Sequence, residues 1–337
     1  MNTKKALITG IAGQDGSYLT ELLLNLGYQV IGIVRDNTKL ENIRHLLNKI
    51  ELYEADLTDF NKLKSIILKS KPNQIYNLGG VTTLSGFTKN PSYSIKVTEG
   101  AARIIFETAV GLKKMGHDIK IFQASTCLIF GSPAICPQNE HTPFIPVTPY
   151  AKSKLKVDLY AKDLRESEKL YISCGILYNH ESPRRPLDFV TRKITVAAAC
   201  IYNKVKKIPN DRFGNPIMTE NFMLRIGDID ARRDWGDARD FVRAFSLILE
   251  QVSADDFIIA TGKTHNVQEV LDIAFGFLGL DWRNYIFEDQ DSVRAIDTNT
   301  LCGDATKAKL KLGWAPQIKF ENTIKDMIKN DIRIFSN

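Results

Sequence analysis

Tyr150 and Lys154 are the pair of residues in this sequence best suited to moving a proton. Tyr150 opens the segment PYAKSK, and Lys154 follows four residues later, one turn along the same face of a predicted helix. An ammonium group at that position lowers the pKa of a phenol from its reference of about 10. The phenolate removes a proton from a substrate hydroxyl while a nicotinamide takes the hydride from the same carbon. We therefore assign both residues to catalysis and to the cofactor site.

Two hydroxyl residues, Ser125 and Thr126, stand at the end of a predicted strand in the segment QASTCLIFG. We expect one of these hydroxyls to hydrogen-bond the substrate hydroxyl that Tyr150 deprotonates. Side chains of an extended backbone alternate with period two, so Leu128 would face the same site as Thr126. The sequence thus places a side chain that cannot accept a proton beside the reacting groups.

A nucleotide-binding turn is predicted between the first strand and the first helix, where GIAGQDG has the spacing G-x-x-G-x-x-G. Glycines let the chain turn tightly and let a pyrophosphate approach N–H groups at a helix N-terminus. The strand–turn–helix setting makes the pattern more specific than the glycines alone. The cofactor residues assigned from this turn and from the later segment YNLGG are Gly10, Gly13, Gln14, Asp15, Gly16 and Leu78.

The segment VRDN, at the end of the second predicted strand, should meet the adenosine ribose of the cofactor. Arg35 could pair with the 2′-phosphate of NADP, whereas Asp36 could accept from the 2′-hydroxyl of NAD. The two interpretations compete because a carboxylate repels a phosphate, so the cofactor is either NAD or NADP. Asp56 and Leu57 suit a contact with the adenine edge, and Asp59 an ordinary helix N-cap.

Short apolar runs alternate with stretches of helical spacing through the first half of the chain. KKALITG, VIGIV, KPNQIYNLGG, DIKIFQAS and YISCGILY predict strands, and three longer stretches, from SYLTELL, PSYSIKV and PYAKSKL onward, predict helices. This alternation favours an α/β fold with a Rossmann-type doubly wound parallel sheet. Ligands of such sheets lie at the carboxyl ends of strands, so the loops after ALITG, YNLGG and QAST should meet in one cleft.

We predict two parts in the chain. Residues 1–180 form an NAD(P)-binding domain that includes the Tyr–Lys helix. Residues 181–337 form mainly a smaller C-terminal substrate-binding region, interleaved with the last elements of the sheet. The division rests on a loosening of the pattern after about residue 180, where proline-, arginine- and aspartate-rich segments such as HESPRRPLDF and DIDARRDWGDARDF begin.

The composition indicates an ordinary cytoplasmic globular protein. The 337 residues are 44% hydrophobic and 25% charged, and no apolar run approaches the roughly 18 residues of a membrane span. The five cysteines are scattered without a CxxC pair, so neither a disulfide framework nor a metal site is expected. The net charge of +6 suits an anionic small molecule, and no basic block is dense enough to favour nucleic acid.

These features together resemble the extended short-chain dehydrogenase/reductase family of sugar-nucleotide enzymes. More closely, ITGIAGQDGSYL, NHESPRR, FVTRKI, ARRDWGDARDFV, IATGKTHNVQE and GDATKAKLKLGW resemble GDP-mannose 4,6-dehydratases over essentially the whole chain. The resemblance implies an NAD(P)-dependent enzyme, a GDP-sugar substrate and a homodimer or homotetramer. It implies these substrate-binding residues: Thr82, Asn179, Val190, Lys193, Arg225, Arg232, Arg294 and Asp297. Arginine and lysine match phosphate oxygens, and a carboxylate suits ribose hydroxyls.

The sequence departs from this family where the family eliminates water. The family's reaction moves a hydride from C4 of the hexose, eliminates water across C5 and C6, and returns the hydride to C6. The elimination uses a glutamate two residues after the active threonine, and that position is Leu128 here. Losing a positioned acid or base costs about 10²–10⁴-fold in rate, and neither Cys127 nor Glu140 is a convincing replacement. GGVTT also replaces the family's Ala-Ala-Gln-Ser-His, and the aspartate of VRDN replaces a second arginine.

Three functions remain open at this point. The protein oxidises C4 of a GDP-hexose or GDP-heptose without eliminating water, or it is a true dehydratase that uses a different base. In the third interpretation it is a catalytically impaired paralogue that binds GDP-sugar and cofactor in a regulatory role. The retained Thr126, Tyr150 and Lys154 favour an enzyme, because a pure binding protein has no use for hydride-transfer groups. Leu128 is then a specificity feature that prevents elimination.

Overall fold

The computed structural model describes residues 3–37, 39–81, 84–133, 135–211, 213–288 and 301–336. The strands are β1 (Lys5–Thr9), β2 (Gln29–Val34), β3 (Glu51–Glu54), β4 (Gln74–Asn77), β5 (Lys120–Ala124), β6 (Tyr171–Leu177), β7 (Asn179–Glu181), β8 (Leu224–Ile226), β9 (Arg232–Asp237), β10 (Phe257–Ile259), β11 (Thr264–Asn266) and β12 (Ile286–Glu288). The α-helices are α1 (Gln14–Asn25), α2 (Phe60–Ser70), α3 (Leu84–Lys89), α4 (Pro91–Ile95), α5 (Ala101–Lys114), α6 (Pro149–Ser167), α7 (Val190–Tyr202), α8 (Ala238–Glu250), α9 (Val267–Gly276), α10 (Thr306–Leu312) and α11 (Phe320–Ile334). Short 3₁₀ helices are η1 (Glu41–Leu46), η3 (Cys127–Phe130) and η4 (Trp282–Asn284), and η2 (Lys96–Gly100) is π-helical.

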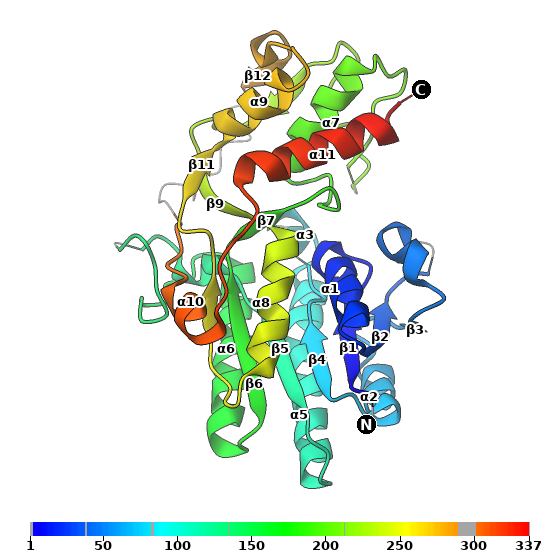
Figure 1. Ribbon diagram of the computed structural model, residues 1–337, viewed down its shortest axis with the longest axis vertical. Coiled ribbons are helices and arrows are strands. Elements are labelled where there is room, and N and C mark those ends of the chain that lie inside the picture. The colour runs from blue at the N-terminus through cyan, green and yellow to red at the C-terminus, as the bar shows by residue number, and fades with distance from the viewer. Residues whose placement is uncertain are drawn as a thin grey trace.

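Seven strands form one central sheet in the order β10-β6-β5-β4-β1-β2-β3. All neighbouring strands of this sheet run parallel, and helices cover both of its faces (Figure 1). The chain moves outward from β1 to β3 and then returns to the other side of β1 with β4, so the order reverses between β1 and β4. The prediction of a Rossmann-type doubly wound sheet is confirmed, and this reversal is where such sheets bind ligands.

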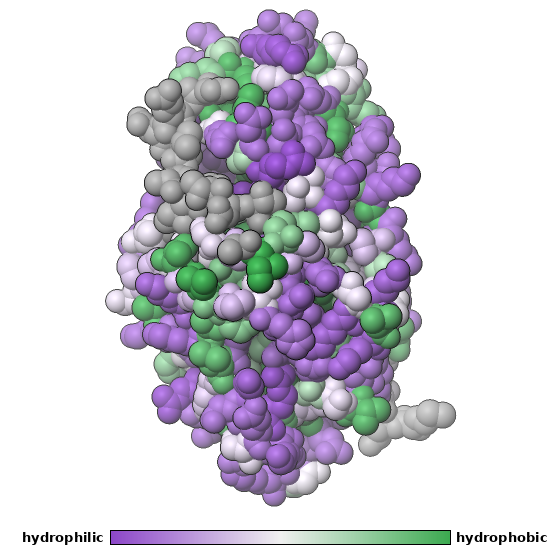
Figure 2. Space-filling view, turned by 90° about the vertical axis from the view of Figure 1, so that its left-hand side faces the viewer, coloured by the Kyte–Doolittle hydropathy of each residue, from purple (hydrophilic) through white to green (hydrophobic). Residues whose placement is uncertain are grey.

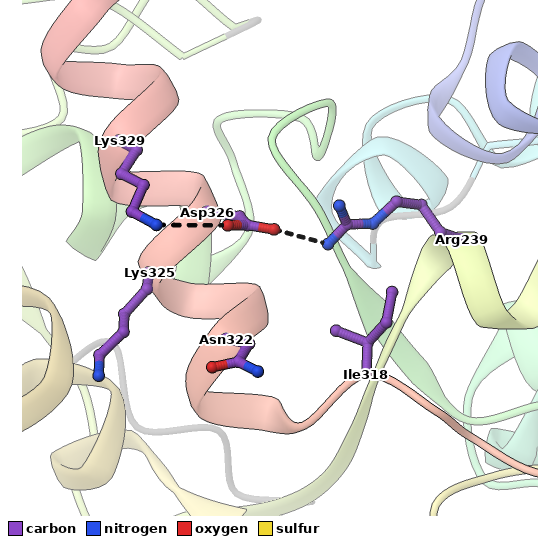
Figure 3. A pocket seen from close by; sticks show the side chains of 6 residues that line it. All are labelled: Arg239, Ile318, Asn322, Lys325, Asp326 and Lys329. Carbon is purple, nitrogen blue, oxygen red and sulfur yellow. Dashed lines mark hydrogen bonds and ion pairs between the residues drawn. The ribbon is translucent and has the colours of Figure 1, made fainter.

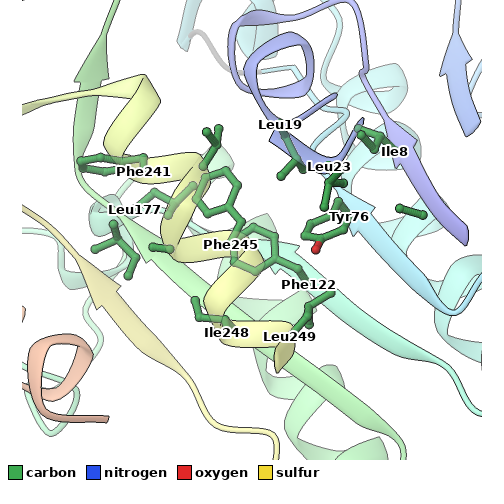
Figure 4. Close-up of a cluster of buried hydrophobic side chains, with 14 of the residues drawn as sticks. Ile8, Leu19, Leu23, Tyr76, Phe122, Leu177, Phe241, Phe245, Ile248 and Leu249 are labelled. Atoms are coloured by element: carbon green, nitrogen blue, oxygen red, sulfur yellow. The ribbon is translucent and has the colours of Figure 1, made fainter. Parts of the chain in front are cut away.

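Apolar side chains on the two faces of the sheet enter two separate cores. Because side chains alternate along a strand, Ile8 packs in the core under α1 and α8, whereas Leu7 packs in the core under α2, α5 and α6. Figure 4 shows the first of these cores, with α8 lying across the sheet. Phe122 of β5 stacks on Phe245 of α8 with ring centroids 4.4 Å apart. The sheet is therefore buried on both faces, as parallel sheets generally are.

Three buried polar side chains join the carboxyl ends of β1, β4 and β5. The Thr9 hydroxyl donates to Oδ1 of Asn77 at 2.8 Å, and Nδ2 of Asn77 donates to Oε1 of Gln123 at 2.7 Å. The N–H of Gly79 donates to the Thr9 hydroxyl at 3.0 Å, which brings the loop after β4 onto the end of β1. The strand ends thus meet as the sequence predicts, although the sequence patterns do not identify the residues that join them.

The remaining elements form the upper part of Figure 1, around α7, α9 and α11. These three helices bury a core of their own with a three-stranded sheet, β11-β9-β7, and a two-stranded sheet, β12-β8. Between these elements the chain returns to the central sheet twice, first with α8 and the edge strand β10 and then with α10, and both helices pack on the first core. The second half of the sequence therefore contributes to both parts of the molecule.

Two elements differ from the sequence-based expectation. The predicted long helix that begins at PSYSIKV contains the π-helical segment η2 between α4 and α5. Gly100 lies in that segment, and a Cβ there would meet the ring of Phe60 at 2.5 Å. The sequence patterns also do not predict β3, because ELYE has charged ends and lies at the sheet edge, where it pairs with β2 alone.

Candidate active site

Tyr150 and Lys154 lie in the first turns of α6, where their positions are closely defined. The hydroxyl of Thr148 caps the helix by accepting from the N–H of Ala151 at 3.1 Å, and proline occupies the first helical position. Both side chains are buried, with Tyr150 8% and Lys154 6% exposed. Nζ of Lys154 lies 6.0 Å from the centre of the Tyr150 ring and donates to the carbonyl of Ala124 at 2.8 Å. The predicted pair therefore meets the end of β5.

Burial controls the ionisation of this pair. It raises the pKa of Tyr150 well above the ordinary value, against smaller lowering effects from Thr126 and Arg185. Burial likewise lowers the pKa of Lys154. The expectation that Lys154 would hold the Tyr150 pKa below its usual value is therefore wrong for this structure, because burial of the phenol outweighs the nearby charges.

The backbone stays extended at Thr126 and then changes conformation. The strand ends at Ala124, and Cys127–Phe130 form the 3₁₀ helix η3 with Thr126 as its N-cap. The expectation of alternating side chains through Leu128 is therefore wrong. The N–H of Leu128 donates to the Thr126 hydroxyl at 3.3 Å, so the two residues are neighbours because of the cap. Leu128 is partly buried against an apolar cluster that includes Phe130.

Neither alternative proton acceptor weighed above is free to replace the absent glutamate. Cys127 is buried in the same apolar cluster, and burial raises its pKa to about 12. Glu140 accepts from the N–H of Ile258 in β10 at 2.9 Å, so its carboxylate is engaged at the sheet edge.

The predicted glycine turn brings three backbone segments into close contact. Gly10 has a φ of +70°, and a Cβ there would meet Cα of Gly79 at 2.9 Å. Gly13 is the N-cap of α1, and its N–H donates to the carbonyl of Gly10 at 2.9 Å. Gly16 lies in the first turn of α1, where a Cβ would meet the same carbonyl oxygen at 2.4 Å. The turn is thus as tight as a pyrophosphate cradle requires.

We expect the substitution Gly16→Ala to destabilise the protein by about 1–3 kcal/mol, because its methyl group would overlap backbone atoms that cannot move aside. The measurement is the free energy of unfolding in urea, together with cofactor binding followed by fluorescence. Gly111→Ala is the matched control, since no heavy atom lies within 4 Å of a Cβ in that interior position of α5. Alanine there should stabilise the helix by about 0.5–1 kcal/mol. Equal stabilities of Gly16→Ala and the unmodified protein would contradict the prediction.

Gln14 and Asp15, which the sequence analysis assigns to the cofactor, contact the segment after β6. Oδ2 of Asp15 lies 3.0 Å from Nε2 of His180, and Nδ1 of that ring lies 2.7 Å from the carbonyl of Tyr178. Nε2 of Gln14 donates to the His180 carbonyl at 3.0 Å, and its Oε1 accepts from Ser182 at 2.8 Å. This network ties the start of α1 to the beginning of the substrate-binding region.

The Asp15–His180 pair makes stability depend on pH. Burial would raise the pKa of Asp15, but His180 lowers it overall, below the ordinary 3.8. Burial would lower the pKa of His180, but Asp15 raises it overall, above the ordinary 6.5. The contribution of Asp15 is therefore lost as the pH falls through its lowered pKa. The contribution of His180 to stability is complete below pH 6.5 and is lost as the pH rises through its raised pKa.

We expect Asp15→Asn to cost about 3–5 kcal/mol near pH 5.5, because it leaves His180 buried without its partner. The cost should be smaller near about pH 8.5, where His180 is less protonated in both proteins. Urea unfolding at the two pH values measures the difference. Asp118→Asn, in an exposed loop before β5, is the control, and its effect on the free energy of unfolding should be the same at the two pH values. A cost of Asp15→Asn that does not change with pH would count against an ion pair.

The residues predicted to meet the adenosine lie near Tyr93. Arg35 donates to the Tyr93 hydroxyl at 3.2 Å, and this hydroxyl donates to Oδ2 of Asp56 at 2.9 Å. Asp36 follows Arg35 beyond β2, and Asp59 caps α2, as predicted, by accepting from the N–H of Lys62 at 3.0 Å. The structure thus connects the ends of β2 and β3 through one tyrosine.

Two apolar residues predicted to contact the cofactor lie in or beside the sheet cores. Leu78 is partly buried against the core under α1, and Leu57 against the core under α2. The Leu57 side chain also borders Gly79, where an added Cβ would meet it at 2.6 Å. Both leucines therefore flank the contact between the loop after β4 and the glycine turn.

The residues predicted to bind the substrate spread over the upper part of the molecule. Asn179 begins β7, and Val190 and Lys193 lie in the first turn of α7. Arg225 of β8 places its guanidinium 5.5 Å from the centre of the Phe287 ring. Arg232 of β9 donates to the carbonyl of Thr264 at 2.8 Å. The other three predicted residues lie outside the described ranges: Thr82, Arg294 and Asp297.

A polar pocket between α8 and α11 does not coincide with the predicted site. It is lined by Arg239, Ile318, Asn322, Lys325, Asp326 and Lys329 (Figure 3). Arg239 donates to both carboxylate oxygens of Asp237 and to Asp326. The arginine is thus committed to joining the two helices. None of the strand-end loops contributes to this pocket.

Several residues of the site are not predicted from the sequence. They are Tyr93, Asp158, His180 and Arg185. Nε of Arg185 lies 3.2 Å from Glu181, and its charge also lowers the pKa of Tyr150. The segment NHESPRR contains two of these residues, so the resemblance that assigns Asn179 is a signal that could have found them. Asp158 lies four residues after Lys154 and could have been found from helical spacing.

The fold and the strand-end site define an α/β protein of the Rossmann type. The structure resembles UDP-glucose 4-epimerase of Thermotoga maritima with a TM-score of 0.83 and 22% identity, over 98% of this chain and 99% of that one. It also resembles dTDP-glucose 4,6-dehydratase of Bacillus anthracis, with a TM-score of 0.79 and 19% identity, over 97% of this chain and 96% of that one. At these identities the likeness concerns the fold.

Sequence comparison identifies the family. The family model of GDP-mannose 4,6 dehydratase matches residues 7–327. GDP-mannose 4,6 dehydratase 2 of Arabidopsis thaliana is 41% identical over 98% of this chain and 87% of its own length. The human GDP-mannose 4,6 dehydratase is 35% identical over 98% of this chain and 91% of its own length. The chain belongs to the GDP-mannose 4,6 dehydratase family, and the resemblance stated from its motifs is confirmed.

Proposed function

We propose that this protein is an NAD(P)-dependent enzyme that oxidises C4 of a GDP-hexose or GDP-heptose by hydride transfer. The observation that carries the proposal is the meeting of Tyr150, Lys154 and Thr126 at the end of β5, in the same sheet edge as the glycine turn. Family membership supports the GDP-sugar, since the relatives bear the name of GDP-mannose dehydratases.

The residues around the glycine turn fit a dinucleotide. Bound NAD or NADP supplies the hydride acceptor. The close backbone contacts at Gly10 and Gly16 leave N–H groups at the start of α1 to hold a pyrophosphate. Arg35 and Asp56, joined through Tyr93, would hold the adenosine side. Arg35 favours the phosphorylated cofactor and Asp36 the other, so both NAD and NADP are to be tested.

The protein's own groups then handle the substrate proton. Tyr150 accepts the proton of the C4 hydroxyl, and the Thr126 hydroxyl orients that oxygen. The Lys154 ammonium stabilises the phenolate, which burial otherwise disfavours. Leu128 stands where the family has its glutamate, and the one carboxylate described close by, Asp158, is held by the hydroxyl of Ser125. Oxidation is therefore not followed by efficient loss of water.

A second candidate, full dehydration with a different base, is favoured by the relatives' names and by 41% identity to one of them. The third, a cofactor-binding regulatory paralogue, has no such observation in its support. The three are separated by one experiment. The protein is mixed with GDP-mannose and each cofactor, while nicotinamide absorbance and product mass are recorded.

Reduced cofactor without loss of water supports C4 oxidation. Loss of one water supports dehydration and overturns the proposal that elimination is blocked. When neither change occurs with GDP-mannose, a GDP-heptose is the next substrate, and failure there too would overturn the enzymatic function.

We further infer that substrate contacts come from Asn179, Val190, Lys193, Arg225 and Arg232, and that residues 181–337 contribute most of them. A cytoplasmic location is supported by the free thiols of all five cysteines. None of the described helices is long and apolar enough to cross a membrane.

The protein is proposed to form a homodimer or homotetramer. Exposed apolar side chains gather in the loop that precedes α6 and support such an association: Ile135, Phe144, Ile145 and Val147. Figure 2 views the side from which this loop projects, and hydrophobic residues interrupt a largely hydrophilic surface there. Light scattering after size-exclusion chromatography measures the assembly, and a monomer at micromolar concentration would overturn it.

A further inference from the structure

A carboxylate beneath the catalytic pair has no role in the chemistry described so far. Asp158 lies one turn after Lys154 on α6, and its Oδ2 accepts a hydrogen bond from the hydroxyl of Ser125. Its Oδ1 is screened from solvent and accepts no hydrogen bond of ordinary geometry among the described residues, although the Cys174 thiol of β6 interacts with the carboxyl group. A buried carboxylate oxygen without a donor is costly, so a purely structural role would favour a neutral side chain here.

The charges around Asp158 come from three elements. On α6, Lys154 lowers the pKa of Asp158, and on β6 the Cys174 thiol acts in the same direction. Asp256, in the loop before β10, raises it, but its carboxylate is neutralised by Arg165 at 2.8 and 2.7 Å. Burial is the largest effect and raises the pKa of Asp158 to about 7.

Asp158 in turn acts on Lys154. Burial lowers the pKa of Lys154, and Asp158 is the largest influence in the opposite direction. The hydrogen bond that the structure gives to the ammonium goes to the neutral carbonyl of Ala124. A carbonyl carries no net charge, so it stabilises the ammonium less than a carboxylate does.

We propose that Asp158 is a positioning residue of the hydride-transfer site, which holds Ser125 and keeps Lys154 charged beside Tyr150. The inference rests on the proposed function, because it assigns the charge of Lys154 a part in C4 oxidation. Asp158 is hydrogen-bonded to Ser125 and lies one helical turn from Lys154. It acts through its two neighbours, each at the end of β5 or one helical turn away.

The test is the substitution Asp158→Asn, which keeps the shape of the side chain and removes the charge. Lys154 should then lose its proton at a pH lower by at least about one unit. NMR of protein with ¹³Cε-labelled lysine measures this titration without substrate, and the signal of Lys154 is assigned by its absence in Lys154→Arg. Asp163→Asn, an exposed position of the same helix, is the matched control and should leave the titration unchanged.

The pH profile of cofactor reduction gives a second readout. Loss of the Lys154 proton limits the rate at high pH. The high-pH limb of the profile should therefore move to lower pH in Asp158→Asn by the same amount as the Lys154 titration. Asp158 is also among the smaller influences that raise the pKa of Tyr150, so the acid limb should not move to higher pH. Asp158→Glu restores the carboxylate and should restore both limbs in part.

An unchanged Lys154 titration in Asp158→Asn would overturn the proposal, whatever the effect on stability. Should Asp158→Asn fail to fold, Ser125→Ala tests the same link. The Ser125 hydrogen bond lowers the pKa of Asp158, so its loss leaves less carboxylate at neutral pH. The Lys154 titration should then move in the same direction by a smaller amount, and a shift of zero would count equally against the proposal. Because the titration needs no substrate, failure of the proposed function would appear separately, as absence of cofactor reduction in the unmodified protein.

Discussion

Tyr150→Phe should slow the reduction of cofactor by a GDP-sugar about 10²–10⁴-fold, because it removes the group that accepts the C4 proton. The ring packs against Phe87 with centroids 5.9 Å apart, and phenylalanine preserves this contact. Binding of the GDP-sugar and the melting temperature should therefore change little. Single-turnover absorbance of the nicotinamide measures the chemical step, and calorimetry measures the binding of the sugar nucleotide.

Tyr160→Phe is the control for this substitution. Tyr160 lies on the same helix, and its hydroxyl donates to Oε1 of Glu107 at 3.4 Å. The control should keep the unmodified rate. A Tyr150→Phe protein that retains the rate to within about tenfold would show that another group takes the proton, since removal of a general base costs more than this.

The second large effect is expected at Leu128, where the substitution Leu128→Glu should introduce water elimination. The rate of water loss should rise about 10²–10⁴-fold, which corresponds to roughly 3–5 kcal/mol of barrier. Leu128 is partly buried beside the Thr126 cap, and a carboxyl group in such surroundings has a raised pKa. It can then accept the C5 proton and return one to the departing hydroxyl. Product mass after incubation with GDP-mannose measures the effect.

Leu128→Gln separates this chemistry from a change of shape. Glutamine has the length and polarity of glutamate without an ionisable group, so it should oxidise C4 but not eliminate water. Equal water loss by the two variants would show that the carboxylate is not the missing group. Rapid water loss by the unmodified protein would show that Leu128 does not block elimination at all.

The sheet and much of the site could be predicted because they follow from short-range patterns. Alternating apolar runs and helical stretches gave the parallel strands, and the four-residue spacing of Tyr150 and Lys154 put both at one end of α6. The glycine turn was recognisable because its three glycines stand between a strand and a helix. In each case the residues that act together lie within a few positions of one another.

The remaining parts of the site depend on contacts between distant segments. Asp15 and His180 are 165 positions apart, and Ser125 and Asp158 are 33 apart. No periodicity joins such residues, so only packing of the elements reveals them. The 3₁₀ turn at Cys127 escaped prediction for a different reason. Its apolar residues also fit a strand, and the capping hydrogen bond of Thr126 decided the conformation.

The hydrogen-bonded residues at the carboxyl ends of the strands continue as far as the catalytic lysine. Nε2 of Gln123 donates to the carbonyl of Ala124 at 2.9 Å, and Nζ of Lys154 donates to the same oxygen at 2.8 Å. Together with Thr9 and Asn77, these groups form an unbroken line from the glycine turn to the ammonium group. The line crosses β1, β4 and β5, which are adjacent strands.

Adjacent strands are about 4.8 Å apart, so the separation of the two ends is a fixed number of strand spacings. The spacing of the strands therefore fixes the distance between the glycine turn and the Lys154 ammonium group, the two ends that a dinucleotide would contact. Hydrogen bonds of the buried Thr9, Asn77 and Gln123 side chains hold these strand ends together. A ligand that reaches both ends must therefore span the ends of three adjacent strands, β1, β4 and β5.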